Sequence, residues 1–232
     1  MAEFESRPAE TTREVFLSTA EAHFAEHGFD GARVDSIAHT AGHSKNLIFR
    51  HFGDKLGLYK AVLEQTDRKL GELQARMFGP LIDNPSLAAD AHQFKTFLEM
   101  LVTVTFEYLL DHPRFLRIFT WEMAQGWQTY AQLLSPIDSD EVSRFEMIFQ
   151  TAWNAGLLQS VFTPVIQLTL ILQVCQSYIA FLPLYQNMLP GSDVSSASML
   201  AGAKEHLVTL VVSGMLATPN PPRQEHGVSP SS

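Results

Sequence analysis

The most restrictive feature of the sequence is a long stretch without charge. No Asp, Glu, Lys or Arg occurs from Met147 to Ser192, although such residues make up 18% of the chain. The part that follows Pro164 is long enough to span a bilayer. Gln167, Gln173 and Gln176 in its middle, Pro183, and the lack of Lys or Arg near either end argue against membrane insertion. We therefore expect a helix that is buried in the core and against a partner subunit.

Apolar residues recur at spacings of three and four along the chain, which predicts helices. The first helix is expected to end at Gly28, a second to run from Val34 to Ala41, a third to begin at Ser44, and a fourth at Asp54. Glycine is typical of helix ends that need a left-handed residue, and serine or aspartate caps helix starts. No strand-like alternation or internal repeat occurs, so the predicted fold class is all-α.

Longer helices are expected after Gly79-Pro80. The first carries an apolar stripe from Phe94 to Tyr108, and two more are predicted over residues 115–127 and 140–158. Another begins with proline in its first turn at Pro164 and runs to about residue 189, with Pro183 expected to end or kink it. The last carries a helix-packing seam. The chain then ends in a segment rich in proline and serine, which predicts disorder over residues 218–232.

Composition narrows the function without naming it. The 232 residues include 25 acidic and 16 basic side chains, and a net charge of −9 alone argues against nucleic acid as a partner. The single cysteine, Cys175, excludes an intramolecular disulfide and fits a reducing compartment. The N-terminus is mixed in charge and has no apolar run, so no secretory signal is expected and we predict a cytoplasmic protein.

Catalytic and metal-binding patterns are weak. The segment from His23 to His27 matches the H-x-x-E-H pattern of some zinc peptidases, but it lies in the first helix, directly before the Gly28 cap. A thiol in the charge-free helix is expected to be inert. No phosphate-binding loop, nucleophile elbow or carboxylate pair occurs. We therefore expect no enzymatic activity, no metal and no cofactor.

The segment from Val34 to Phe52 is the most informative for function. Two short helices separated by a tight turn at Gly42 have the geometry of a helix-turn-helix, whose second helix fits the major groove. Between Gly42 and Lys60 stand four basic residues against Asp54 alone, which provides the positive charge that phosphate contact requires. The alternative is a solvated helix face with incidental charge.

Residues 12–64 resemble the N-terminal domain of the tetracycline-repressor (TetR) family of transcriptional regulators. The matching segments are FAEHGFDG, IAHTAG, SKNLIFRHF and GDKLGLYKAV, in order and at the family's spacing. The later helices resemble the family only in number and pattern. The resemblance implies an N-terminal three-helix helix-turn-helix domain and a larger C-terminal helical domain for ligand binding and dimerisation, with about nine helices.

The resemblance also implies a homodimer whose two recognition helices enter successive major grooves of a palindromic operator in double-stranded DNA. Ser44 would cap the recognition helix. The residues after it would approach base edges and lie along the groove, and Lys55 would hold a phosphate. The DNA-binding residues implied are Arg33, Ser44, Lys45, Asn46, Leu47, Phe49, Arg50, His51 and Lys55.

The sequence departs from the family pattern in four places. His43 replaces a small residue, Asn46-Leu47 replaces a Gly-Thr pair, and His51 precedes Phe52 where an aromatic is common; these changes are expected to alter which operator is read. At the start of the second helix Arg33 stands in place of a hydroxyl residue and is expected to contact phosphate, although it caps the helix less well.

The C-terminal helices predict dimerisation more clearly than ligand binding. The seam that we expect at the dimer interface comprises Leu200, Ala203, Leu207, Leu210 and Gly214. Aromatic side chains favour a small, mostly apolar or aromatic effector, and a carboxylate among Glu99, Glu107 and Glu122 would favour a cationic one. The predicted pocket residues are Leu101, Trp121, Trp127, Phe149, Trp153, Tyr178 and Phe181, and the alternative for each is a place in the core.

These observations predict four segments: a flexible tail over residues 1–10, the helix-turn-helix domain over 11–60, the effector-binding and dimerisation domain over 61–217, and the disordered tail. The predicted function is a ligand-relieved repressor that binds DNA as a homodimer. The alternative keeps the fold but makes the protein a helical dimeric scaffold or an effector-independent DNA-binding protein.

Overall fold

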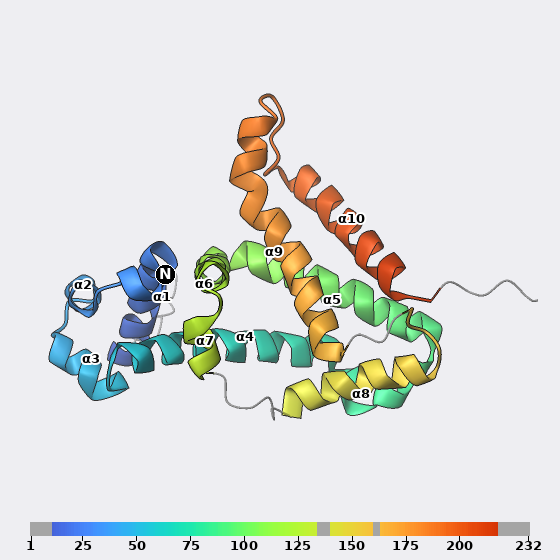
Figure 1. The fold of residues 1–232 in the computed structure, drawn as a ribbon, viewed down its shortest axis with the longest axis horizontal. Helices are drawn as coiled ribbons and strands as arrows, with labels where there is room; N and C mark the ends of the chain where they lie inside the picture. The colour runs from blue at the N-terminus through green and yellow to red at the C-terminus, as the bar shows by residue number, and fades with distance from the viewer. Residues whose placement is uncertain (1–10, 134–139, 160–162, 218–232) are drawn as a thin grey trace, which may run out of the picture.

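A computed structural model describes residues 11–133, 140–159 and 163–217, so both predicted tails, 1–10 and 218–232, lie outside the described residues. The described residues form helices and one isolated antiparallel bridge between Leu158 and Leu216. The predicted all-α fold class is therefore confirmed. Figure 1 shows helices α1 to α3 gathered at one end and helices α4 to α10 forming the rest.

The N-terminal group comprises α1 (Thr12–Gly31), α2 (Val34–Thr40), α3 (Lys45–Phe52) and the first turns of α4 (Lys55–Asp83). Thr11 and Glu14 form a capping box, in which each side chain satisfies a backbone amide of the other residue. The four helices enclose a core of their own, in which Phe16, Phe24 and Tyr59 are among the largest fully buried side chains.

Gly28 interrupts α1 as the sequence predicts. Its φ of 68° and ψ of 177° are not helical, and this region of backbone conformation is open essentially to glycine alone. A side chain would also have no room, because a Cβ atom built on Gly28 would lie 3.0 Å from the ring of Trp121. The chain nevertheless continues in helical form to Gly31 before α2 begins.

The prediction that short helices give way at Gly79-Pro80 is wrong. Helix α4 runs through this pair to Asp83, and a short 3₁₀ helix, η1 (Pro85–Ala89), connects it to α5 (Ala91–Asp111). A proline this close to a helix end removes one backbone hydrogen bond from the last turns, which a long helix tolerates. The predicted stripe on α5 is confirmed, since the side chains from Phe94 to Tyr108 at its spacing are buried.

The helix predicted over residues 115–127 ends three residues earlier than expected. Helix α6 (Pro113–Ala124) ends before Gly126 and Trp127, which both have positive φ, and α7 (Gln128–Leu133) follows. Helix α8 (Asp140–Asn154) ends four residues before the predicted position, because Gly156 turns the chain with a φ of 74°. Both differences arise where a glycine adopts a left-handed conformation.

The last two helices, α9 and α10, both pack against α5, and Figure 1 shows α9 crossing it. Helix α9 (Pro164–Met188) begins where predicted and ends within one residue of the predicted position, so of the two effects expected of Pro183, an end to the helix is excluded. Among the described residues, α9 is the one helix that is both long enough and apolar enough to cross a membrane. In its most apolar stretch, 28% of the residues are buried. Helix α10 (Ala197–Met215) completes the fold, and it packs chiefly against α5.

Candidate nucleic-acid interface

The turn between α2 and α3 has the tight geometry of a helix-turn-helix. Gly42 has a φ of 70°, and the amide of His43 donates to the carbonyl of Ala38 at 3.0 Å. The Ser44 hydroxyl accepts from the amide of Leu47 at 3.3 Å, which confirms the predicted cap of α3. Ile48 is fully buried and anchors α3 against α1, so the opposite side of α3 is turned to solvent.

The solvent side of α3 carries most of the residues that the sequence assigns to DNA. Lys45, Asn46, Phe49, Arg50 and His51 are exposed, whereas Leu47 is half-buried against the core. The side chains of Asn46 and Arg50 have no hydrogen bond or ion pair to another described residue. Asn and Arg pair bidentately with adenine and guanine, respectively, so this face has the groups that direct base reading requires.

Lys45 is held by a residue that the sequence prediction did not include. Its ammonium lies 3.0 Å from Asp35 Oδ2 on α2 and 5.6 Å from the centre of the Phe49 ring. Both side chains of the ion pair are largely exposed, so the pair is weak in water. Asp35 therefore orients Lys45 along the surface without removing it from reach of a partner.

Lys55 is more constrained than a surface lysine. Its ammonium donates to the carbonyl of Asp30 at 3.2 Å and lies 4.7 Å from the centre of the Phe29 ring. Partial burial lowers the pKa of Lys55 below its usual value, against the attraction of Asp30. An ammonium has three donors, so this contact fixes the start of α4 to α1 and leaves further donors available.

Two other basic residues flank the same region. Arg33 is exposed at the start of α2 and makes no side-chain cap, in agreement with its expected weakness as a capping residue. Arg13 near the start of α1 is exposed and lies 5.4 Å from the centre of the Phe52 ring, at the end of α3. Sequence reasoning missed Arg13, although its place two residues after the Thr11 cap indicates an exposed first turn.

A buried carboxylate joins this module to the rest of the chain. Glu122 on α6 is 1% exposed; it accepts from the Tyr59 hydroxyl at 2.6 Å and from the amide of Tyr130 at 2.9 Å. Burial, and then the hydrogen bond to Glu122, raise the pKa of Tyr59 well above its usual value. Glu122 was expected to face a cavity or solvent, and it does neither.

The rest of the junction is formed by α1 and α6. The indole of Trp121 donates to the carbonyl of Ala25 at 3.3 Å and covers Gly28, while Ile118 belongs to the N-terminal core. Together with the Glu122 contacts, these interactions fix α6 to both α1 and α4. A displacement of α6 would therefore move the helix-turn-helix module with it.

The structure does not bring the seven predicted pocket residues together. Leu101 and Phe149 are core residues, Trp121 lies at the junction with α1, and Phe181 is exposed on α9. The other three residues pack partly buried on the C-terminal core, and they are Trp127, Trp153 and Tyr178. None of the seven is among the residues that line the two cavities described below, so their assignment to a pocket stays a prediction.

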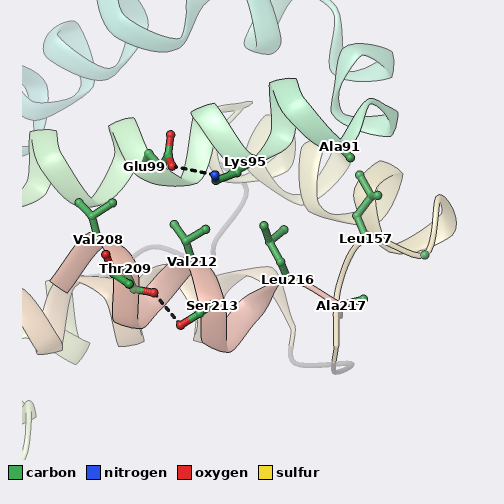
Figure 2. A pocket seen from close by; sticks show the side chains of 11 residues that line it. Ala91, Lys95, Glu99, Leu157, Val208, Thr209, Val212, Ser213, Leu216 and Ala217 are labelled. Carbon is green, nitrogen blue, oxygen red and sulfur yellow. Dashed lines mark hydrogen bonds and ion pairs between the residues drawn. The ribbon is translucent and has the colours of Figure 1, made fainter. Parts of the chain in front are cut away.

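Two cavities occur among the described residues. One of about 860 Å³ lies between α5 and α10, beside the end of α8, and it is shown in Figure 2. A smaller one of about 280 Å³ lies between α4 and α5 and is lined by Met77, Phe78 and Phe97 among others. Of the three carboxylates that the sequence singled out, Glu99 lines the larger cavity, whereas Glu107 pairs with Lys204.

The predicted dimer seam on α10 is divided between two faces. Leu207 is 7% exposed and belongs to the C-terminal core, whereas Leu210 is 53% exposed and Gly214 is also exposed. Leu200 and Ala203 are half-buried at the border. The seam residues at spacings of three and four diverge in environment because α5 covers only one side of the helix.

Cys175 and His23 lie in surroundings that indicate structural roles. Cys175 is buried on α9, and burial raises the pKa of its thiol to about 12. His23 lies within hydrogen-bond distance of the Thr40 hydroxyl, 3.1 Å from Nε2. Within the part of the chain that the structure describes, no cluster of three or more His, Cys, Asp or Glu side chains could hold a metal ion.

Two family models match this chain. One is described as bacterial regulatory proteins, tetR family, and matches residues 16–62. The other is described as tetracyclin repressor-like, C-terminal domain, and matches residues 95–211. The first match covers the helix-turn-helix module, and the second covers most of the helices that follow it.

Two curated relatives agree with these family models. The HTH-type transcriptional repressor SCO4008 of Streptomyces coelicolor is 32% identical over 50% of this chain and 52% of its own length. NicS, a repressor of Pseudomonas putida, is 27% identical over 66% of this chain and 69% of its own length. The chain thus spans about half the length of the first relative and about two thirds of the second.

Solved structures share the fold at low identity. SCO4942 of Streptomyces coelicolor, described as a transcriptional regulator, is 24% identical and superposes with a TM-score of 0.62 over 88% of this chain and 98% of its own. The Bacillus subtilis regulator FadR in complex with stearoyl-CoA is 17% identical, with a TM-score of 0.58 over 86% and 97% of the two chains. The part of the chain that these structures cover therefore has the arrangement of helices seen in them.

Proposed function

The chain belongs to the tetR family of bacterial regulatory proteins, and on that premise we propose that it is a sequence-specific, DNA-binding transcriptional repressor. The observation that carries this proposal is the exposed face of α3, where Asn46 and Arg50 have no partner among the described residues. Repression fits the relatives, which are named transcriptional repressors. We place the protein in the cytoplasm, where bacterial DNA is accessible.

The side chains of α3 divide into base-reading and positioning groups. Arg50 and Asn46 reach base edges in the major groove, and Lys45 exchanges Asp35 for a phosphate or a base. Arg33, His51 and the Ser44 amide lie along the backbone, and Lys55 adds a phosphate contact from its fixed position on Asp30. Phe49 packs on a thymine methyl or the sugar-phosphate backbone.

A homodimer is supported by apolar surfaces on the last two helices. Ile166, Leu170, Phe181 and Leu184 are exposed on α9 at spacings that place them on one side of the helix. Leu210 and Gly214 are exposed on α10. An apolar area of this kind indicates an interface, and two copies of the α9 and α10 pair would cover it as a four-helix bundle. The dimer would present two copies of α3 to a palindromic operator.

An effector would act through the junction between α1 and α6. Because Glu122 and Trp121 hold α6 to the N-terminal module, a ligand that shifts α6 also changes the separation of the two recognition helices in the dimer. The ligand must bind the displaced form more tightly to relieve repression, since differential affinity supplies the shift. We propose a small, mostly apolar effector for this role.

The proposal is tested by selecting bound fragments from a random DNA pool at moderate salt with the intact protein. We expect an enriched palindrome whose half-site centres lie about one helical turn, or a small multiple of it, apart. No enrichment by a folded dimer, in buffer and in cell extract, would favour the alternative of a helical scaffold. An enriched site that no extract component releases would favour an effector-independent DNA-binding protein.

A further inference from the structure

The cavity between α5 and α10 has walls suited to an aliphatic ligand. Branched side chains of Leu157, Val208, Val212 and Leu216 line it, and no aromatic residue does. Its volume of about 860 Å³ falls within the range of small-molecule sites. Figure 2 shows the aliphatic groups of α10 facing the side of α5 that carries Lys95 and Glu99. A flat aromatic compound would find no ring to stack on here.

Helix α10 is fixed to its neighbours at both ends of this cavity. Toward the middle of the helix, Leu207 is buried in the C-terminal core and Lys204 pairs with Glu107 of α5. At the other end, the amide of Ala217 donates to the carbonyl of Leu157 at 2.8 Å, and that of Gln159 donates to Met215 at 2.9 Å. The cavity therefore cannot close by a simple approach of α10 to α5.

The two hydroxyl groups that line the cavity use their protons within α10 and keep their lone pairs available to a ligand. The hydroxyl of Thr209 donates to the carbonyl of Glu205 at 2.9 Å, and that of Ser213 donates to Thr209 at 2.6 Å. Each hydroxyl has one proton, so only lone pairs remain for a ligand. The Glu99 carboxylate adds further acceptors on the opposite wall, and Lys95, 3.6 Å from it, is the cation among the lining residues.

We propose that this cavity binds a small amphipathic cation with an aliphatic body and an ammonium head. The body lies against Val208, Val212 and Leu216, and the head donates to Glu99, with the hydroxyl oxygens of α10 as additional acceptors. An aliphatic carboxylate fits less well because Lys95, the cation in the lining, already pairs with Glu99, and the two hydroxyls offer a carboxylate only lone pairs. Binding does not depend on the proposed function; regulation of DNA by this ligand does.

The matched probes are octylamine, 1-octanol and octanoate, which share one chain and differ in the head group. Calorimetric titration of the full-length protein at pH 7.5 is expected to give the tightest binding for octylamine, by about tenfold or more, because hydrogen bonds between charged groups are the stronger ones. Equal affinities, or a preference for octanoate, would overturn the proposal.

Two variants locate the binding site. Glu99→Gln is expected to weaken octylamine binding about tenfold or more and to leave octanol unchanged. Glu64→Gln is the control, because Glu64 forms the same kind of i,i+4 pair with Lys60, at 3.8 Å, on α4 away from the cavity. If both variants bind octylamine like the wild type, the ammonium does not contact Glu99 and the proposal fails.

Val212→Trp fills the cavity and is expected to abolish binding of the whole series. Circular dichroism establishes whether this variant is folded; if it is not, the Glu99 comparison decides. Unchanged binding by folded Val212→Trp protein would overturn the proposal. Affinity for the selected DNA, measured with and without octylamine, is a separate readout: DNA binding without ligand binding refutes the cavity alone, whereas ligand binding without DNA binding refutes the repressor.

Discussion

The exposed face of α3 and the buried junction between α1 and α6 differ in whether their polar side chains have hydrogen-bond partners. On α3, Asn46 and Arg50 project into solvent without a partner among the described residues. At the junction, Glu122 and Trp121 each have a hydrogen-bond partner in another part of the fold. A surface that recognises DNA must leave its donors and acceptors available, whereas a buried connection is stable only when they are satisfied.

The largest effect is expected at the buried side of this comparison. Glu122→Ala removes the acceptor of Tyr59 and of the Tyr130 amide and leaves a small cavity, so it should lower the free energy of unfolding by about 2–4 kcal/mol. Chemical denaturation measures this loss. Glu107→Ala, at an exposed carboxylate paired with Lys204, is the control and should cost less than about 1 kcal/mol. Equal losses of unfolding free energy in the two variants would show that the buried contacts of Glu122 stabilise the fold no more than an exposed ion pair does.

On the exposed side, Arg50→Ala should leave stability unchanged and weaken binding to the selected operator by about 1–3 kcal/mol, with relaxed preference at one base position. Binding to operators with single-base changes measures the base preference.

Lys55→Ala should instead weaken binding to all sequences and lower the salt slope by about one unit. Equal, sequence-independent losses from both variants would mean that Arg50 contacts only phosphate.

Gly28 tests the backbone of the junction. Gly28→Ala forces a side chain into a conformation with φ of 68° and against the Trp121 ring, so a loss of about 1–2 kcal/mol in the free energy of unfolding is expected. Gly79→Ala, where a Cβ meets nothing within 4 Å in α4, should be neutral or slightly stabilising. A neutral Gly28→Ala would show that α6 is not closely packed on α1.

The smallest effect concerns the inner face of α9. Because burial raises the pKa of Cys175 to about 12, its thiol stays protonated in the folded protein at pH values where an unfolded thiol ionises. This contribution to stability is complete below the ordinary thiol pKa of about 8.5 and is lost as the pH rises through the folded value. Iodoacetamide at pH 8 should therefore label Cys175 only after unfolding. Rapid labelling of the native protein would contradict the packing of α9.

The sequence was a good guide where structure depends on neighbouring residues. The Ser44 cap, the glycine turns at Gly28 and Gly42, and the start of the helix at Pro164 follow from local chemistry. The implied DNA-binding residues remain a prediction, but most of them lie on one exposed face.

Contacts between distant residues could not be predicted in this way. Tyr59 and Glu122 are 63 positions apart, and no periodicity indicates that they meet. The same limit applies to the predicted aromatic pocket and the α10 seam. The spacing of Phe149 and Leu207 does not distinguish a functional residue from a core residue, whereas packing against α5 buries both side chains in the core. The cavity lined by Glu99 arises from how α10 is fixed at both ends, which depends on contacts with α5 and the end of α8.

The most direct test of the central claim is methylation protection of guanine N7, an atom in the major groove, on the selected operator. We expect protected guanines in two symmetric half-sites for the wild-type protein, and loss of protection at one guanine of each half-site in Arg50→Ala at saturating protein. Protection that is confined to one half-site, or that is identical in the two proteins, would contradict base reading by α3.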